Sequence, residues 1–280
     1  AVSEMSRFAE AGFSTFDLAD IYGPAEGYVG SFKKGRLSSP LQRDCQFFTK
    51  WVPRPGLVTK PSEARAITED AIGRSLRRME TEQLDLVQFH WWEYENKCYF
   101  DCMSELMRLK DMGQIRNIGL TNIDTKRMMQ LLDQGAPIVS NQVSYSIIDT
   151  RPSELMAPAM LSAGEDGPRL LCYGALVGGF LSNHWLNKPE PSKEDLANVS
   201  LRKYLPWIVA WGGWGLFQEL LRVLADIGHK HHASISNIAV RWVLDRPAVA
   251  GAIVGARLGY REHIADNAKV SSSSRLTGTL

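Results

Sequence analysis

The sequence predicts an α/β fold in which parallel strands alternate with helices. Short β-branched or aromatic segments recur between amphipathic segments with helical spacing along most of the 280 residues. Strands that are separated by helical crossovers pair in parallel. An open doubly wound sheet would be expected to carry a Gly-x-Gly-x-x-Gly turn after an early strand, and this chain has none. We therefore expect a (β/α)8 TIM barrel that forms one domain over residues 1–280.

Seven segments have the composition of strands, which is one fewer than a closed barrel requires. Because the chain opens on a helix, we expect the first strand of the barrel to precede Ala1 and to be missing from this sequence. The strand-like segments lie at 13–17, 45–50, 84–90, 115–120, 138–143, 169–173 and 250–254.

The helix-like segments have apolar residues on one face, and several of them have recognisable end signals. We expect Gly12 to follow the first helix as its C-terminal cap. Ser62, after Pro61, and Asp124 are the expected N-caps of two further helices. The helical segments lie at 1–11, 26–34, 62–79, 101–112, 124–132, 153–163, 218–229, 236–244 and 260–270.

Residues 182–215 are longer than an ordinary connection between a strand and a helix. They contain four tryptophans among proline and polar residues, at 185, 207, 211 and 214. We expect an irregular but ordered segment that packs on the barrel. The serines and threonines of 271–280 predict an irregular tail.

Composition excludes several classes of partner. A net charge of +1, from 32 basic and 31 acidic residues, gives no electrostatic footprint for nucleic acid or an anionic membrane. No apolar run of about 18 residues predicts a membrane span, and we expect no signal peptide. The four cysteines form no Cys-x-x-Cys pair, so we expect thiols in the cytoplasm or in an organelle stroma or matrix. Cys98 and Cys102 could share one helix face, but two ligands do not make a zinc site, and we expect no metal.

Three predicted strands end in ionisable side chains, namely Asp17, Lys50 and His90, and Tyr22 lies on the loop after the first of them. In a barrel these strand ends converge on one rim. A phenol has a pKa near 10, so it donates a proton readily at neutral pH only where a nearby cation stabilises the phenolate. Lys50 can supply that cation if Asp17 holds it in place, and His90 can hydrogen-bond a substrate oxygen. None of the four is a hydride source, so a reduction would need a cofactor.

Taken with motifs further along the chain, this set resembles the aldo-keto reductase superfamily. The resemblance implies an NADP(H)-dependent oxidoreductase that reduces the carbonyl of a small aldehyde or ketone. It also implies that Tyr22 is the general acid, that Asp17 and Lys50 tune it, and that His90 orients the carbonyl. The motifs are Asp-Leu-Ala-Asp-Ile-Tyr-Gly at 17–23, Lys50, His90, Gly-Leu-Thr-Asn at 119–122, Asn-Gln-Val at 141–143, Tyr-Gly-Ala-Leu at 173–176, Gly-Ala-Arg at 255–257 and Asp-Asn at 266–267.

The resemblance also assigns cofactor-binding positions. An amide pair, Asn122 and Gln142, is similar to the residues that hold the nicotinamide carboxamide, which needs a donor and an acceptor. Tyr173 resembles the ring that stacks on the nicotinamide, and Arg257 resembles the cation at the 2′-phosphate, which favours NADP over NAD. The further positions are Thr121 beside the carboxamide, Gly174, Leu176, Gly178 and Gly179 near the pyrophosphate, Arg261 as a second cation, and Asp266 and Asn267 near the adenine.

Several alternatives remain open at this point. Trp51 and Trp91 directly follow Lys50 and His90 and could wall a substrate pocket or only pack the barrel mouth. Gln142 and Tyr173 could be ordinary polar and core residues, the 178–179 glycines a simple turn, and Arg257 a surface residue paired with Asp266. The chain could also be an NADPH-binding regulatory or scaffold subunit of a larger assembly, or an NAD-linked sugar dehydrogenase. The sequence does not give the oligomeric state.

Overall fold

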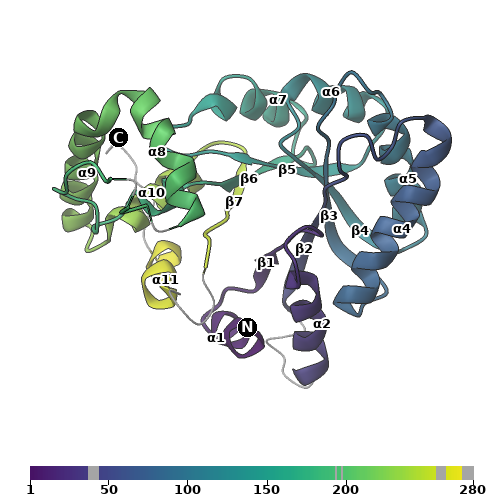
Figure 1. Cartoon of the computed structure of the whole chain (residues 1–280), viewed down its shortest axis with the longest axis horizontal. Coiled ribbons are helices and arrows are strands. Elements are labelled where there is room, and N and C mark those ends of the chain that lie inside the picture. Colours follow the sequence, from purple (N-terminus) through teal and green to yellow (C-terminus); the bar gives the residue numbers. More distant parts are fainter. Residues whose placement is uncertain (37–43, 193, 197, 257–262, 273–280) are drawn as a thin grey trace. The chain divides into compact units, whose positions relative to one another are not determined.

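The protein folds into alternating strands and helices around a parallel sheet (Figure 1). The computed structural model describes residues 1–36, 44–192, 194–196, 198–256 and 263–272. Strand order in the sheet follows chain order from β1 to β7. The expected α/β fold of the (β/α)8 barrel class is therefore confirmed, with seven strands in the part of the chain that the structure describes. These strands are β1 Thr15–Asp17, β2 Gln46–Trp51, β3 Leu84–His90, β4 Ile115–Thr121, β5 Ile138–Ser144, β6 Arg169–Tyr173 and β7 Val249–Ala252.

The helices occupy the crossovers between consecutive strands and both ends of the described chain. None of those in the described ranges is both long and apolar enough to cross a bilayer. They are α1 Val2–Glu10, α2 Ala25–Arg36, α4 Pro61–Met79, α5 Tyr99–Asp111, α6 Thr125–Asp133, α7 Met156–Ser162, α8 Val199–Trp211, α9 Gly213–Lys230, α10 Ile235–Leu244 and α11 Ile264–Ser272, with short 3-10 turns at Arg151–Ser153 and Val177–Gly179.

Two of the three predicted helix end signals are confirmed. Gly12 follows α1 with φ +91°, the left-handed conformation that favours glycine after a helix. The Asp124 carboxylate accepts the backbone N–H of Arg127 and caps α6. The prediction for Ser62 was wrong, because α4 begins one residue earlier, at Pro61, with Lys60 as N-cap. Proline fits the first helical position, since the N–H that it lacks would have no helical partner there.

The chain divides into two compact units, and the single domain of 1–280 stays a prediction. The first unit comprises the described residues of 1–143 and 159–169 and contains strands β1 to β4 and most of β5. Its strand register sets Lys50 beside Gln88 and Gln88 beside Gly119. A Cβ on Gly119 would lie 2.5 Å from Ser140 Oγ, so only glycine lets β4 approach β5 so closely here.

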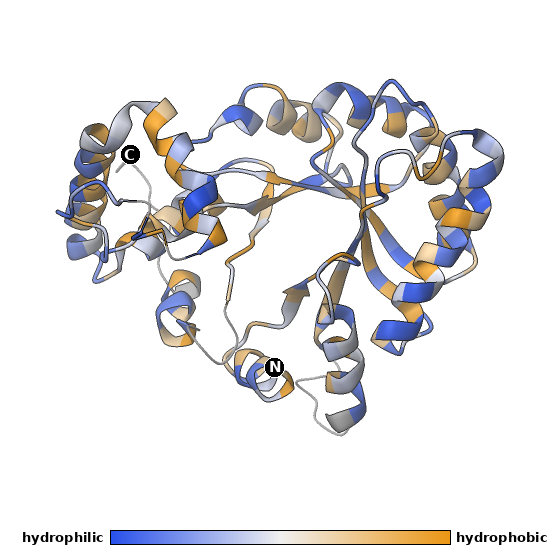
Figure 2. Cartoon of the chain, in the orientation of Figure 1, coloured by the Kyte–Doolittle hydropathy of each residue, from blue (hydrophilic) through white to orange (hydrophobic). Residues whose placement is uncertain are grey.

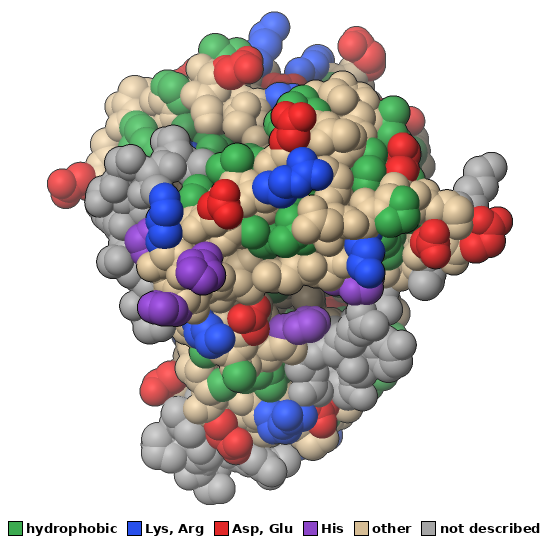
Figure 3. All heavy atoms as spheres, turned by 90° about the vertical axis from the view of Figure 1, so that its left-hand side faces the viewer, with side chains coloured by type: hydrophobic (Ala, Val, Ile, Leu, Met, Phe, Trp, Pro, Cys, Tyr) green, Lys and Arg blue, Asp and Glu red, His purple; other side chains and the backbone are tan. Residues whose placement is uncertain are grey.

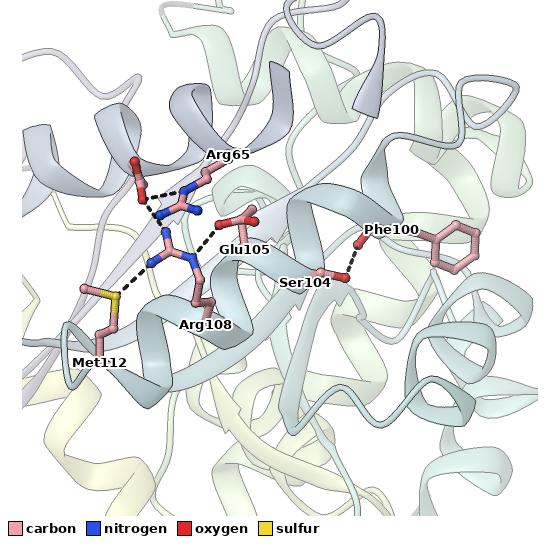
Figure 4. Close-up of polar contacts among 7 residues, drawn as sticks. Arg65, Phe100, Ser104, Glu105, Arg108 and Met112 are labelled. Atoms are coloured by element: carbon pink, nitrogen blue, oxygen red, sulfur yellow. Dashed lines mark hydrogen bonds and ion pairs between the residues drawn. The ribbon is translucent and has the colours of Figure 1, made fainter. Parts of the chain in front are cut away.

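Helices α4 and α5 of the first unit are joined across their outer faces by an ion-pair network (Figure 4). Arg108 on α5 donates to Glu105 on its own helix, to Glu69 on α4 and to the sulfur of Met112. Arg65 donates to the same Glu69 at 3.3 Å. Partly exposed pairs contribute little, about 0–1 kcal/mol each. The buried apolar faces of these helices therefore supply most of the packing energy; Figure 2 shows hydrophobic and hydrophilic residues side by side along both.

The second unit comprises 144–158, 170–256 and the described residues of 263–272. Its core is an aromatic cluster in which Phe180 lies against Trp185, Trp214 and Phe217, with ring centroids 5.0 to 6.4 Å apart. All four side chains are less than 10% exposed. On the face of the molecule in Figure 3, acidic and basic side chains are interspersed, in keeping with the small net charge.

The prediction that residues 182–215 are irregular was wrong, because they include α8 and the start of α9. Asn198 caps α8 by accepting the backbone N–H of Leu201, a signal that the sequence interpretation missed. Pro206 lies inside α8, where a proline ordinarily argues against a helix. The expected order of the segment is confirmed at Trp185 and Trp214, which lie in the aromatic cluster. The prediction of an irregular tail over 271–280 was wrong at 271–272, which belong to α11, and residues 273–280 lie outside the described residues.

Candidate active site

Asp17 and Lys50 form a buried ion pair at the ends of β1 and β2. Lys50 Nζ donates to Asp17 Oδ2 at 2.5 Å and to the carbonyl oxygen of Leu18 at 2.8 Å. Lys50 is only 4% exposed, and an ammonium so far from water persists because its partners replace the lost hydration. Burial lowers the pKa of Lys50 and the Asp17 carboxylate raises it, with burial the larger effect. The pair therefore holds a cation whose proton is easier to remove than that of an ordinary lysine.

The loop after β1 carries Tyr22 over this ion pair. Asp20 ties the loop to the end of β2, because its N–H donates to the carbonyl of Lys50 at 3.0 Å and its carboxylate accepts the N–H of Val52 at 3.2 Å. The N–H of Tyr22 then donates to the carbonyl of Ala19 and closes a turn. The turn places the Tyr22 ring centroid 5.3 Å from Lys50 Nζ. Tyr22 is 53% exposed, so its ring faces solvent above a buried cation.

His90 ends β3 and is the fourth residue of the predicted set. It is buried, and burial lowers its pKa, so its imidazole is neutral at pH 7. Its Nδ1 is buried without a hydrogen-bond partner among the described residues. The ring lies 4.2 Å from that of Trp92, which is 53% exposed. A neutral imidazole at a strand end can donate to or accept from an oxygen that is brought to it.

Gln88 belongs to this cluster although the sequence interpretation did not include it. Its Nε2 donates to Asp17 Oδ1 at 2.9 Å. Gln142 donates to the same oxygen at 2.8 Å and to Gln88 Oε1 at 2.6 Å. One sequence signal was available: Gln88 is a polar residue in an otherwise apolar stretch of β3, two positions before His90 and so on the same face.

The predicted cofactor positions in the first unit lie at the ends of β4 and β5. Thr121 pairs with His90 in the strand register, and its hydroxyl is buried without a hydrogen-bond partner among the described residues. Asn122 has φ +54°, and its N–H donates to the carbonyl of Gln142 at 2.9 Å. Buried polar atoms such as Thr121 Oγ1 and His90 Nδ1 are costly unless they bind a further group. A polar ligand such as a carboxamide fits this part of the site.

In the second unit, Tyr173 ends β6 and Gly174 follows it. Lys203 Nζ on α8 lies 5.3 Å from the Tyr173 ring centroid. A Cβ on Gly174, which has φ +75°, would lie 2.5 Å from the Tyr204 hydroxyl oxygen. The backbone therefore needs a glycine at 174 both for its conformation and for its close approach to α8.

The remaining predicted glycines lie in the 3-10 turn after Gly174. A Cβ on Gly178, with φ +68°, would lie 2.9 Å from the backbone oxygen of Ser200. Gly179, with φ +104°, has open space where its Cβ would be. Leu176 is partly buried against the core of the second unit. Packing against α8 accounts for Gly178, and its positive φ accounts for Gly179.

The positions predicted to bind the rest of the cofactor are only partly described. Arg257 and Arg261 lie outside the described residues. Asp266 accepts a hydrogen bond from Ser234 Oγ at 2.9 Å and joins the N-terminal cap of α10. The backbone N–H of Asn267, in α11, donates to the carbonyl of His263 at 2.8 Å, one residue before the helix begins. Asp266 thus has a structural role that does not depend on a ligand.

Trp51 and Trp91 are 3% and 6% exposed, and their ring centroids lie 5.2 and 5.8 Å from that of Phe89. These placements favour the packing alternative for both residues. The exposed tryptophan beside His90 is Trp92, which the sequence interpretation passed over.

Other features of the described chain point to no competing centre. No group of three or more metal-binding side chains occurs there, and no disulfide joins its cysteines. Burial raises the pKa of the Cys102 and Cys172 thiols to about 12, so neither is a thiolate at neutral pH. A groove of about 290 Å³ is lined mainly by α5 and by none of the predicted site residues.

Curated relatives at low identity span much of the chain. It is 29% identical over 182 residues to the flagellar radial spoke protein 5 of Chlamydomonas reinhardtii, which covers 59% of this chain and 34% of that protein. It is 24% identical over 253 residues to the chloroplastic pyridoxal reductase of Arabidopsis thaliana, covering 86% of this chain and 64% of the relative. It is 27% identical over 206 residues to the aldo-keto reductase YhdN of Bacillus subtilis, covering 72% of this chain and 57% of that protein. The chain thus spans between one third and two thirds of the length of these relatives.

Solved structures share the fold at 20–24% identity. The glycerol dehydrogenase AKR11B4 of Gluconobacter oxydans matches with a TM-score of 0.75 and 24% identity, over 99% of this chain and 81% of that one. An aldo/keto reductase of Klebsiella pneumoniae in complex with NADP and acetate matches with a TM-score of 0.68 and 20% identity, over 99% and 81%. The model of the aldo/keto reductase family matches residues 1–278. Because that match spans nearly all of the sequence, this chain belongs to the aldo/keto reductase family.

Proposed function

We propose that the protein is an NADPH-dependent oxidoreductase that reduces the carbonyl of an aldehyde or ketone, with Tyr22 as the general acid. The observation that carries this proposal is the buried Lys50–Asp17 ion pair beneath the exposed ring of Tyr22. The ammonium of Lys50 lies 5.3 Å from the centroid of the Tyr22 ring. A cation beside a phenol lowers the energy of the phenolate and so makes the phenol a better proton donor. The nicotinamide, when bound, supplies the hydride.

Asp17 and His90 have separate roles in the proposed reaction. Asp17 keeps the ammonium of Lys50 charged and aimed, because burial alone would favour the neutral amine. His90 is neutral, so it offers a hydrogen bond to the substrate oxygen without adding a second cation to the site. Negative charge that develops on that oxygen is stabilised by donors fixed in advance by the strands.

The cofactor positions follow the family resemblance. Thr121, Asn122 and Gln142 lie at neighbouring strand ends and offer hydroxyl and amide groups to a carboxamide. Tyr173 and Arg257 are proposed for the nicotinamide ring and the 2′-phosphate. Among the fold relatives, the Klebsiella reductase is described in complex with NADP, which supports this cofactor.

We assign the aromatic wall of the substrate site to Trp92. Its ring is half exposed and lies against His90, so a flat carbonyl compound could stack on it while its oxygen meets the imidazole. A small aldehyde or ketone with an aromatic group is the expected substrate class. We place the protein in the cytoplasm or in an organelle stroma; the pyridoxal reductase among its relatives is chloroplastic.

A regulatory or scaffold role is the second candidate. One relative is a component of the flagellar radial spoke, and it shares 29% identity over 59% of this chain. That likeness favours an assembly subunit. The ion pair of Lys50 and Asp17 beneath the ring of Tyr22 favours turnover.

Two measurements separate these functions. Fluorescence titration gives the dissociation constants for NADPH and NADH. The rate of NADPH oxidation, read from the absorbance at 340 nm, measures turnover of each of a panel of aromatic and aliphatic aldehydes, beginning with 4-nitrobenzaldehyde. We expect tighter binding of NADPH than NADH and turnover of an aromatic aldehyde. Tight NADPH binding without turnover of any aldehyde would support the scaffold role, and tighter NADH binding would contradict the cofactor assignment.

A further inference from the structure

We infer that Gln88 is a positioning residue for the acid–base group: its side-chain amide holds Oδ1 of Asp17 so that Oδ2 faces the ammonium of Lys50. This inference rests on the proposed function, because it assigns a task within the same site. Gln88 lies in β3, whereas Asp17 and Lys50 lie in β1 and β2, so the contact joins all three strands.

The strand register puts the Gln88 amide where it can reach the carboxylate. Gln88 pairs with Lys50 on one side and with Gly119 on the other. An ideal Cβ built on Gly119 would come within 3.4 Å of Gln88 Cγ, so the missing side chain leaves room for the glutamine. Gln88 is completely buried. A buried amide is retained at low cost only where both its nitrogen and its oxygen have partners.

Both ends of the Gln88 amide are satisfied within the site. Nε2 donates to Asp17 Oδ1 at 2.9 Å, and Oε1 accepts from Gln142 Nε2 at 2.6 Å. Gln142 Nε2 also donates to Asp17 Oδ1 at 2.8 Å. A carboxylate only accepts, so N–H groups must face Asp17, and this fixes the orientation of both amides. Gln142 thus holds the amide of Gln88 in its orientation, and both amides hold Oδ1 of Asp17 in place.

The consequence is a carboxylate that cannot turn away from Lys50 without breaking two hydrogen bonds. Asp17 accepts from Gln88 and Gln142 on Oδ1 and from Lys50 on Oδ2. Hydrogen bonds to charged groups are worth more than neutral ones, so loss of one donor changes the population of the productive arrangement by about 10- to 100-fold. Gln88 is assigned no contact with the cofactor, whereas Gln142 is, and this difference makes the two roles separable.

The first test compares Gln88→Leu with a matched control, Gln218→Leu. Gln218 is also a buried glutamine with a partner on each end of its amide, but it lies in the second unit. We expect Gln88→Leu to lower kcat for aldehyde reduction by about 10- to 100-fold, with the NADPH dissociation constant changed less than about threefold. Gln218→Leu should leave kcat within about twofold of wild type. A wild-type kcat in folded Gln88→Leu would overturn the inference.

Gln88→Glu is an isosteric second variant with a pH-dependent readout. Its new carboxyl group can donate to Asp17 Oδ1 only when protonated, and as a carboxylate it repels Asp17. Activity relative to wild type should therefore recover as pH falls and decline as pH rises. A general packing defect would give a ratio to wild type that does not depend on pH, and that result would contradict a positioning role.

A third readout does not need turnover. In protein labelled with 13C at the lysine ε-carbon, the Lys50 signal is the one absent from Lys50→Met. Because Asp17 raises the pKa of Lys50, loosening Asp17 in Gln88→Leu should move the Lys50 titration to lower pH, and Gln218→Leu should not. If wild type reduces no aldehyde, the proposed function fails and this titration still decides the inference. An unchanged Lys50 titration would refute it.

Discussion

Removing Lys50 should cost the protein both stability and catalysis. Lys50 is 4% exposed and paired with Asp17, so Lys50→Met leaves a carboxylate at the sheet end without its cation. Breaking one side of a buried ion pair costs roughly 3–5 kcal/mol. Because Asp17 keeps two amide donors and its side chain is 15% exposed, we expect the lower end, about 3 kcal/mol, for Lys50→Met. Carbonyl reduction should fall by about 10²- to 10⁴-fold, the usual contribution of acid–base catalysis.

Urea denaturation of a double-mutant cycle measures this effect. Asp17→Asn alone should also lose about 3 kcal/mol, whereas the double variant should lose no more than either single one, a coupling of about 3 kcal/mol. As a surface control, Arg74→Met breaks the exposed Arg74–Asp70 pair and should cost less than about 1 kcal/mol. A loss below about 1 kcal/mol in Lys50→Met, or single losses that simply add, would refute the account of the ion pair.

Three further predictions concern His90, Trp92 and the core of the second unit. Because burial lowers the pKa of His90 below 6.5, the unfolded state takes up that proton first as pH falls, so wild type loses stability through this window. Between about pH 7.5 and 5.5, His90→Gln should lose less free energy of unfolding than wild type, as measured by urea denaturation at both pH values. The exposed control His229→Gln should lose as much as wild type. Trp92→Ala should raise KM for an aromatic aldehyde about 3- to 10-fold without changing the free energy of unfolding. A KM equal to that of wild type would show that Trp92 does not contact the substrate. Phe217→Ala should lower the free energy of unfolding by about 3–5 kcal/mol, whereas the exposed Val223→Ala should lower it by less than about 0.5 kcal/mol. Thermal or urea unfolding measures both, and equal losses would contradict a stabilising role of the aromatic cluster.

Local patterns predicted the elements that have strong local signals. Strands at 84–90 and 169–173 agree with β3 and β6 at both ends, because each combines an apolar run with flanking polar or turn residues. Helix α8 was missed because Pro206 lies inside it. Its stability comes from tertiary packing: Tyr204 and Ile208 are buried in the core of the second unit, a contribution that no local pattern shows.

The site was predictable where the strand ends alone carry the chemistry. Asp17, Lys50 and Tyr22 come together because parallel strands of one sheet end at one edge. Gln88 could not be found in this way, since its contact with Asp17 spans 71 residues of chain and depends on the strand register. The register becomes visible only in the folded sheet.

Tyr22→Phe tests the central claim most directly, because it removes one hydroxyl from an exposed ring and leaves the Lys50–Asp17 pair in place. The measurement is kcat for 4-nitrobenzaldehyde reduction, taken alongside the NADPH dissociation constant by fluorescence. We predict a fall in kcat of about 100-fold or more with NADPH binding within about twofold of wild type. A variant that turns over at the wild-type rate would show that the proton comes from another group and would contradict this account.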